Sequence, residues 1–463
     1  MCNKVITIWP MIILSVITLV SCQQEIENLK SPNLFVENIS QNKHGQRSIY
    51  QISADGSHAE HIYDFGERDL YWFSPDFHYL AFTDSVPGSE NAKPDLTLID
   101  IRTNQVVTQI SDITPYIRQN SVVWDPTGSK LLFDRTFSDR GSVDWWVYDI
   151  ATGSQEILTT DTSIKLFPAW STDGQYIAYV ATPCPNHVAD CNRIGDIWDI
   201  TVVNVDTKAI RKVTDFADNS IALELGTGDE LFCNLQWSFN NQHIAFENQC
   251  MRAGPIYERH RVFIVDITNE TVQEALTFEQ PYAYTYSYEW RESGDLLIGY
   301  TQTNLYDFQT FSRGGILSFD PLQSLDTRSA ELLGFHGNEV RWSSNGKTFM
   351  VFTQEPIFTI PQNGQLPGSG ATLLGDFQDG DLTIFPESTV LPNGLCQGNA
   401  AYWSADGQFV AFSSTGQQHV CNQDVSETDV FVYSVVNKAT VNITESVDGR
   451  AKPIGWAASN EQP

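Results

Sequence analysis

Residues 170–179 read Trp-Ser-Thr-Asp-Gly-Gln-Tyr-Ile-Ala-Tyr, and residues 403–412 repeat the pattern as Trp-Ser-Ala-Asp-Gly-Gln-Phe-Val-Ala-Phe. In both stretches an aromatic residue ends one strand, a polar turn follows, and an apolar strand begins after the turn. The late glycine, Gly174 or Gly407, supplies a positive φ, as in a type I turn closed by a bulge. The pattern therefore predicts a β-hairpin that the chain uses more than once.

Weaker copies of this hairpin recur along the chain. The aromatic anchors of all copies are Phe73, Trp124, Trp170, Trp237, Trp290, Trp342, Trp403 and Trp456. Their mean spacing is (456 − 73)/7, or about 55 residues, which leaves room for a third and a fourth strand after each hairpin. No long amphipathic helix is found. The pattern indicates an all-β chain of four-stranded antiparallel units, which is typical of propeller blades.

The two ends of the chain complete each other. Residues 34–36, 49–52 and 61–63 have the pattern of a second, third and fourth strand, and residues 453–456 have that of a first strand. Pairing of these ends closes the ring and removes its exposed edges. We therefore expect residues 33–463 to form a single eight-bladed β-propeller. Seven blades is the alternative count, because prolines interrupt the unit at 342–402.

The hairpin repeat resembles a known family. Trp-Ser-x-Asp-Gly at 170–174 and 403–407, followed by Ile-Ala or Val-Ala, resembles the blade repeat of TolB, the periplasmic propeller of the Tol–Pal system. It is also similar to repeats in the propellers of dipeptidyl peptidase IV-like and prolyl oligopeptidase-like proteins. The resemblance implies a propeller over nearly all of 33–463. It does not identify a function, because propellers perform many unrelated tasks.

The N-terminal residues have the pattern of an export signal. Lys4 is the only charge before Glu25, and residues 5–20 are almost wholly apolar. That run is short for a bilayer span, which needs ~20 residues, and it suits a signal peptide. An uncleaved anchor helix is the alternative.

The apolar run ends in Leu-Val-Ser-Cys at 19–22, which resembles the lipobox of bacterial lipoproteins. The resemblance implies cleavage after residue 21 and a diacylglycerol on the sulfur of Cys22. We expect a signal peptide at 1–21, a lipidated Cys22 with a tether at 22–32, and a location on the periplasmic or extracellular face of a bacterial envelope. A chance cysteine is the alternative.

The charge balance is strongly acidic. Lys and Arg number 27 and Asp and Glu number 57, which gives a net charge of −30, while aromatic residues make up 12% of the chain. Nucleic-acid binding needs clustered basic residues, so we expect no nucleic-acid partner. The composition favours a folded protein whose partners carry basic segments.

Six cysteines other than Cys2 and Cys22 form three local pairs. The pairs are Cys184 and Cys191, Cys233 and Cys250, and Cys396 and Cys421. If Trp237 faces Phe246 across its hairpin, Cys233 also faces Cys250, because both pairs of numbers sum to 483. We expect three disulfides in an oxidising compartment. Reduced thiols or a zinc site are the alternatives.

Two groups of residues are candidates for ligand binding. Tyr282, Tyr284 and Tyr286 continue through Tyr288 to Trp290 at a spacing of two, so they share one face of a strand. Blade strands usually have ~5 residues, so we expect Tyr282 and Tyr284 to project past the sheet, where rings stack on sugars or anchor an interface. Packing between blades is the alternative.

The second group is a basic loop. It contains Arg252, Arg259, His260 and Arg261. Arginine recognises carboxylates and phosphates with two parallel hydrogen bonds. Pairing with nearby acids such as Glu258 is the alternative.

No cofactor is expected. Acidic loops are a common source of calcium ligands, and this chain has two, at 215–230 and 376–381. Neither loop has the alternating signature of a calcium-binding loop. The segment His-Ala-Glu-His at 58–61 places its histidines on opposite faces of a strand, so it predicts no metal site.

The function most consistent with the sequence is non-catalytic binding of an envelope protein or peptide. No Gly-x-Ser-x-Gly motif and no phosphate-binding loop occurs. A glycan-binding module or a carbohydrate-active enzyme, such as a lyase or glycosidase, is the alternative. Catalysis is left undecided, because propeller enzymes can assemble sites from scattered loop residues.

Overall fold

The computed structural model describes twenty segments of the chain. They are residues 32–40, 46–66, 71–83, 95–113, 122–136, 143–161, 163–182, 198–216, 232–248, 261–277, 282–304, 312–321, 330–331, 337–343, 348–353, 372–378, 381–384, 401–414, 428–447 and 449–457. The described segments contain strands and turns, and the strands form eight four-stranded antiparallel sheets. Within these segments no helix is long and apolar enough to cross a membrane.

One sheet combines both ends of the chain, and we call it the closing sheet. It consists of β32 (Arg450–Trp456), β1 (Asn33–Ile39), β2 (Arg47–Ser53) and β3 (Ala59–Gly66). The next three sheets are β4 (Tyr71–Phe73), β5 (Tyr79–Thr83), β6 (Leu96–Asp100), β7 (Gln105–Ile110); β8 (Val122–Trp124), β9 (Lys130–Thr136), β10 (Val143–Asp149), β11 (Gln155–Ile157); and β12 (Ile164–Trp170), β13 (Tyr176–Thr182), β14 (Asp199–Asn204), β15 (Ile210–Lys212).

The remaining four sheets follow in chain order. They are β16 (Phe232–Trp237), β17 (His243–Asn248), β18 (Arg261–Asp266), β19 (Thr271–Thr277); β20 (Tyr282–Trp290), β21 (Leu296–Asn304), β22 (Ser312–Phe319), β23 (Ala330–Glu331); β24 (Gly337–Trp342), β25 (Thr348–Thr353), β26 (Thr372–Gln378), β27 (Asp381–Ile384); and β28 (Ala401–Trp403), β29 (Phe409–Ser414), β30 (Asp429–Ser434), β31 (Ala439–Asn442).

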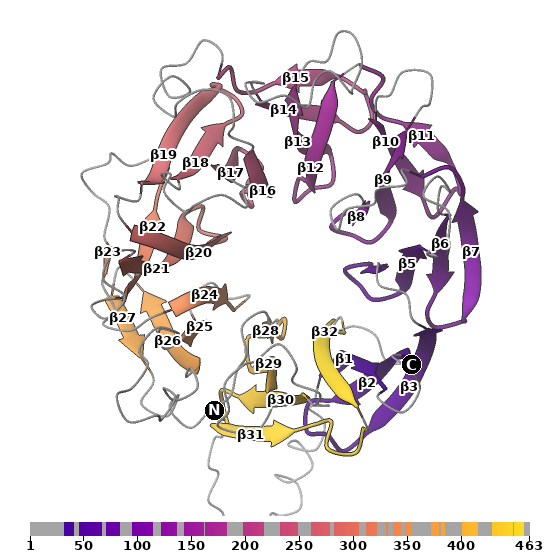
Figure 1. Ribbon diagram of the computed structural model, residues 1–463, viewed down its shortest axis with the longest axis vertical. Coiled ribbons are helices and arrows are strands. Elements are labelled where there is room, and N and C mark those ends of the chain that lie inside the picture. Colours follow the sequence, from indigo (N-terminus) through magenta and orange to yellow (C-terminus); the bar gives the residue numbers. More distant parts are fainter. Residues whose placement is uncertain are drawn as a thin grey trace, which may run out of the picture.

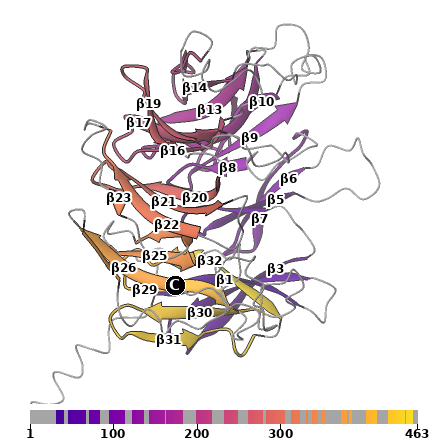
Figure 2. The same ribbon diagram turned by 60° about the vertical axis from the view of Figure 1, so that its left-hand side comes forward.

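The sheets stand around a ring as blades (Figure 1). β8, β16, β24 and β32 lie towards the centre, and β7, β19 and β31 lie at the rim (Figure 1). Figure 2, turned by 60°, shows the blades following one another in chain order. β1 pairs with β32 along its length, with Leu34 opposite Trp456. The pairing of the chain ends is therefore the one that the sequence predicts, and the unit after Trp342 supplies a four-stranded sheet of its own.

The repeated turn is held by its serine. Ser74, Ser171, Ser238 and Ser404 each accept a hydrogen bond from the amide five residues later, at 2.9–3.0 Å. Each of these hydroxyls also donates to the Asp or Asn two residues later, at 2.5–2.7 Å. Because the serine hydroxyl accepts a hydrogen bond from a backbone amide of the hairpin, a Ser-x-Asp or Ser-x-Asn sequence stabilises this turn.

The tryptophan anchors join neighbouring blades. Five of them donate the indole Nε1–H to the carbonyl of the residue just before the preceding anchor. The bonds are Trp124 to Trp72, Trp170 to Val123, Trp237 to Ala169, Trp290 to Gln236, and Trp456 to Tyr402, at 2.9–3.1 Å. At these five interfaces, the recurrence of Trp therefore reflects one hydrogen bond between neighbouring blades.

The expected strand register is wrong by two residues. Trp237 faces Ile244 rather than Phe246, and Trp403 faces Val410 rather than Phe412. The reason is the turn: the Ser238 amide donates to the His243 carbonyl, which fixes the register immediately after the anchor. Cys233 consequently lies opposite Glu247, beyond a β-bulge that follows it.

Two faces of the ring follow from the strand directions. The turn face carries the turns after the inner strands, such as 74–78 and 171–175, together with the turns between third and fourth strands, such as 101–104. The loop face is the opposite one, where the inner strands begin and the outer strands end. β1 begins at the turn face, because the Ala457 amide donates to the carbonyl of Asn33 there, at 2.9 Å.

Candidate functional site

The closing sheet meets the blade β4–β7 at an interface that we call the closing seam. Its residues are Phe35, Glu37, Arg47, Tyr71, Phe73, Phe77, Lys452 and Gly455. The seam differs from the interfaces described above, because the anchor at this position is Phe73 and a phenyl ring has no N–H to donate.

A buried carboxylate occupies the loop-face half of the seam. Glu37 on β1 is fully buried. Its oxygens lie 2.7 Å from Arg47 Nη1 and 2.6 Å from Lys452 Nζ, and the Tyr71 hydroxyl donates to it at 2.5 Å. These groups come from β1, β2, β32 and β4, so one carboxylate joins both ends of the chain to the following blade.

The contacts of this carboxylate stabilise the seam and are unfavourable for proton transfer. Burial raises the pKa of Tyr71 to about 12, so the phenol stays protonated and donates. The Lys452 ammonium lies 5.5 Å from the centre of the Tyr71 ring, which is cation–π distance. Both oxygens of Glu37 are engaged, which leaves the carboxylate poorly placed to act as a general base.

Aromatic rings fill the turn-face half of the seam. Phe77 occupies the turn position that is glycine in most copies, and its φ is 57°. Its ring stacks on Phe35 at 4.7 Å and packs against Phe73 at 5.7 Å. A Cβ at Gly455 would lie 2.8 Å from Phe77 Cε2 and closer still to Cζ. Packing therefore holds a phenylalanine in a conformation that costs about 1–2 kcal/mol for an L-residue.

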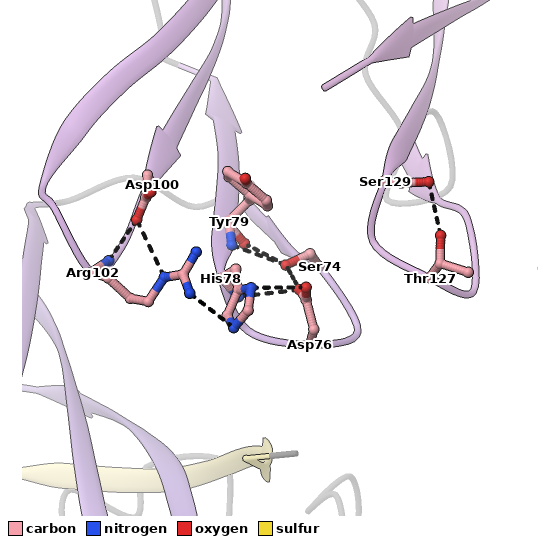
Figure 3. Close-up of polar contacts among 8 residues, drawn as sticks. All are labelled: Ser74, Asp76, His78, Tyr79, Asp100, Arg102, Thr127 and Ser129. Atoms are coloured by element: carbon pink, nitrogen blue, oxygen red, sulfur yellow. Dashed lines mark hydrogen bonds and ion pairs between the residues drawn. The ribbon is translucent and has the colours of Figure 1, made fainter. Parts of the chain in front are cut away.

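A Ser, Asp and His cluster on the turn face has the residue types of a catalytic triad (Figure 3). Its contacts are different. Ser74 bonds to Asp76 and to the Tyr79 amide, as its counterparts do in other blades, and His78 Nδ1 lies 3.1 Å from Asp76 Oδ2. Arg102 Nη1 lies 3.4 Å from His78 Nε2. With Nδ1–H donated to the carboxylate, Nε2 accepts from the guanidinium, so this nitrogen is occupied.

The neighbouring turn completes that surface. Asp125 stands in the serine position and accepts the Lys130 amide at 2.6 Å. Thr127 and Ser129 carry hydroxyls that are 2.8 Å apart (Figure 3). A Cβ at Gly128 would lie 2.9 Å from Asp76 Oδ1, so the glycine lets the carboxylate of the preceding turn approach. The cluster thus connects the turns of adjacent blades.

A buried lysine lies near the loop face. The Lys165 side chain is fully buried, and Nζ lies 3.1 Å from the carbonyls of Asp161 and Ser163. The carboxylates of Asp161 and Asp144 are 3.3 and 3.5 Å away. Burial pushes the pKa of Asp161 upward, but the Ser163 hydroxyl and the Lys165 ammonium outweigh it and lower the pKa. The lysine is a buried cation between two blades.

One interface between blades contains a histidine. His243 is buried and stacks on Trp290 with ring centres 6.0 Å apart, where other interfaces stack Tyr176 on Trp237 or Tyr79 on Trp124. Its buried Nδ1 has no hydrogen-bond partner among the described residues. Burial lowers the pKa of His243, although Asp266 and Asp320 act in the opposite direction. The ring is therefore neutral at pH 7.

The structure corrects one expectation about the tyrosines. Tyr282 pairs with Asn304 and Tyr284 with Gln302, so neither residue projects past the sheet. The reason is that β20 and β21 each have nine residues, which extends the ladder beyond the usual blade strand. The side chains of Tyr282, Tyr284 and Tyr286 lie outside the described residues.

The C-terminal end of the same strand face packs between blades. Tyr288 and Trp290 are buried. The Tyr288 hydroxyl donates to the Asn234 carbonyl of the preceding blade at 2.6 Å, and Trp290 makes the anchor bond. These two residues support the interpretation that this strand face packs between blades.

Most other candidates fall outside the described residues. They include Cys22, Cys184, Cys191, Cys250, Cys396, Cys421, Arg252, Arg259 and His260. Arg261 begins β18 and pairs with Thr277. Cys233 is disulfide-bonded, and its partner is not among the described residues. In the described segments no three His, Cys, Asp or Glu side chains gather as metal ligands.

Two buried charges were not predicted from the sequence. Glu37 lies inside the run Asn-Leu-Phe-Val-Glu-Asn-Ile, and Lys165 lies inside Ile-Lys-Leu-Phe-Pro-Ala-Trp. A single charge within an otherwise apolar strand is the signal that could have identified both, since such a charge is buried only with partners.

Comparison with known proteins agrees with the fold. A TolB homolog from Chlorobium chlorochromatii (strain CaD3) is 30% identical over 144 residues, which is 30% of this chain and 30% of that relative. The crystal structure of Porphyromonas gingivalis dipeptidyl peptidase 4 superposes with a TM-score of 0.53 and 11% identity, over 91% of this chain and 60% of that one.

The crystal structure of TolB from Acinetobacter baumannii matches with a TM-score of 0.33 and 12% identity, over 82% of this chain and 83% of that one. No family model matches the sequence. The blade repeat, the ring of four-stranded sheets and the superposition on dipeptidyl peptidase 4 define the chain as a β-propeller, and over 144 residues its sequence is similar to that of a TolB homolog.

Proposed function

We propose that this protein is a lipid-anchored bacterial envelope protein whose propeller docks a protein or peptide partner without catalysing a reaction. Cys22 carries the anchor, and the expected disulfides place the ring in an oxidising space. The net charge of −30 favours a partner with basic segments.

One observation carries the proposal. The two described clusters that have the residue types of an enzyme centre, Glu37 with its partners and Ser74 with Asp76 and His78, use their polar atoms to hold a seam and a turn. A ring in which these two clusters hold neighbouring elements together is a rigid platform that displays loops. Rigidity lowers the ordering cost of binding.

The test is chemical crosslinking of the full protein in its native envelope, followed by mass spectrometry of the captured material. A captured protein is then purified and bound to the purified propeller. Saturable binding with unchanged ligand is the expected result. Absence of any protein partner, together with turnover of a glycan by the purified propeller, contradicts the proposal and supports a carbohydrate-active enzyme.

A further inference from the structure

The tether joins the ring on a defined face. Pro32 and Asn33 lie at the turn face, where the Pro32 carbonyl accepts the Ala54 amide at 3.0 Å. The described part of the chain therefore begins at that face, on the closing sheet.

The tether is short compared with the blades. Ten residues extend to at most about 35 Å, and a flexible chain of that length has a root-mean-square span of about 17 Å. The seven residues of β1 alone span ~23 Å between the two faces. A tether must be stretched well beyond its average span to bring the loop face to the membrane, which disfavours that orientation roughly tenfold for a Gaussian chain.

Apolar side chains lie on the same face. Phe239 is 49% exposed in the turn after β16, and Val436 is 68% exposed in the turn after β30. Ile210 and Val106 are exposed at the turn-face ends of β15 and β7. Apolar side chains of this kind suit the interfacial region of a bilayer better than open water.

We infer that the turn face lies against the lipid surface that holds Cys22, and that the loop face is presented to partners in the aqueous compartment. This orientation rests on the proposed lipidation of Cys22. It assigns the two faces different roles: the turn face meets lipid, and the loop face meets protein.

The test measures energy transfer from each face to the membrane. Lipidated full-length protein is placed in phosphatidylethanolamine and phosphatidylglycerol vesicles that contain an acceptor-labelled headgroup. A donor dye is attached through an unnatural residue at Thr103 on the turn face or at Ser111 on the loop face. Both positions are exposed and flank β7, so they form a matched pair about 20 Å apart along one strand.

Transfer from the Thr103 position is expected to exceed that from the Ser111 position by about 2-fold or more, given that separation. Equal transfer, or stronger transfer from Ser111, overturns the orientation. Inserting twenty Gly and Ser residues into the tether is expected to bring the ratio towards one, and an unchanged ratio overturns the tether argument. Failure of the protein to join the vesicle fraction instead contradicts the lipid anchor, and with it the proposed function.

Discussion

Gly455→Ala tests the closing seam. The glycine precedes Trp456, in the position that Ala169 occupies before Trp170, so the strand conformation itself accepts alanine. The obstacle is Phe77, because an added methyl group would lie 2.8 Å from Cε2 and closer to Cζ. Phe77 cannot withdraw without losing its stack on Phe35.

The expected cost is that of overpacking, about 1–3 kcal/mol. Unfolding entropy scales as ~2.1 cal/mol/K per residue, or ~0.9 kcal/mol/K for a propeller of about 430 residues, so the Tm is expected to fall by about 1–3 °C. Phe77→Gly removes the ring and its left-handed strain. In that background Gly455→Ala is expected to be neutral or slightly stabilising, because alanine restricts the unfolded chain more than glycine does.

Differential scanning calorimetry on the four proteins of this double-mutant cycle gives the coupling. A coupling of about 1 kcal/mol or more between the two positions is expected. If Gly455→Ala lowers the Tm equally with and without the Phe77 ring, the contact between ring and strand is not the cause, and the account of the seam is refuted.

Three further perturbations address other parts of the ring. His243→Phe is expected to reduce the fall in Tm below pH 6.5. The pKa of His243 in the folded state lies below the unfolded value of 6.5, so this residue contributes stability above that pH, and the contribution is lost on acidification. Equal slopes of Tm against pH in the wild type and the variant would contradict this. Trp170→Phe leaves the Val123 carbonyl without its indole donor and is expected to cost about 1–3 kcal/mol, checked by its melting temperature. Glu37→Gln removes the negative charge beside Lys452 and is expected to cost about 1–3 kcal/mol, because the half-exposed Lys452 side chain stays partly solvated, and a variant that melts like the wild type would show that the Glu37 charge contributes little.

Much of the fold was predictable because its signals are local and repeated. The Ser-x-Asp turn and the Trp anchor each correspond to a recurring hydrogen bond, so the repeated hairpin identifies the four-stranded units along the chain. The closure was predictable because residues 453–456 lacked successors and residues 34–36 lacked an anchor. The strand register was not predictable from the sequence, because it depends on which backbone groups form the hydrogen bond that closes the turn.

The candidate sites were less predictable because burial depends on distant residues. The partners of Glu37 lie 10, 34 and 415 positions away in the chain, by subtraction of the residue numbers, and no local pattern connects them. Tyr288 shares the spacing of its neighbours, but only the preceding blade shows that its hydroxyl bonds to Asn234. The Phe77 substitution is likewise explained only by Gly455 on the opposite side of the seam.

If the propeller docks a protein in the envelope through its loop face, site-specific photo-crosslinking in living cells will capture that protein. The reactive residue is placed at Ser111, at Thr160 or at the turn-face control Thr103, which are all exposed. One protein adduct is expected from the two loop-face positions and none from Thr103. Absence of protein adducts at all three positions would contradict docking, and an adduct from Thr103 alone would contradict the orientation of the ring.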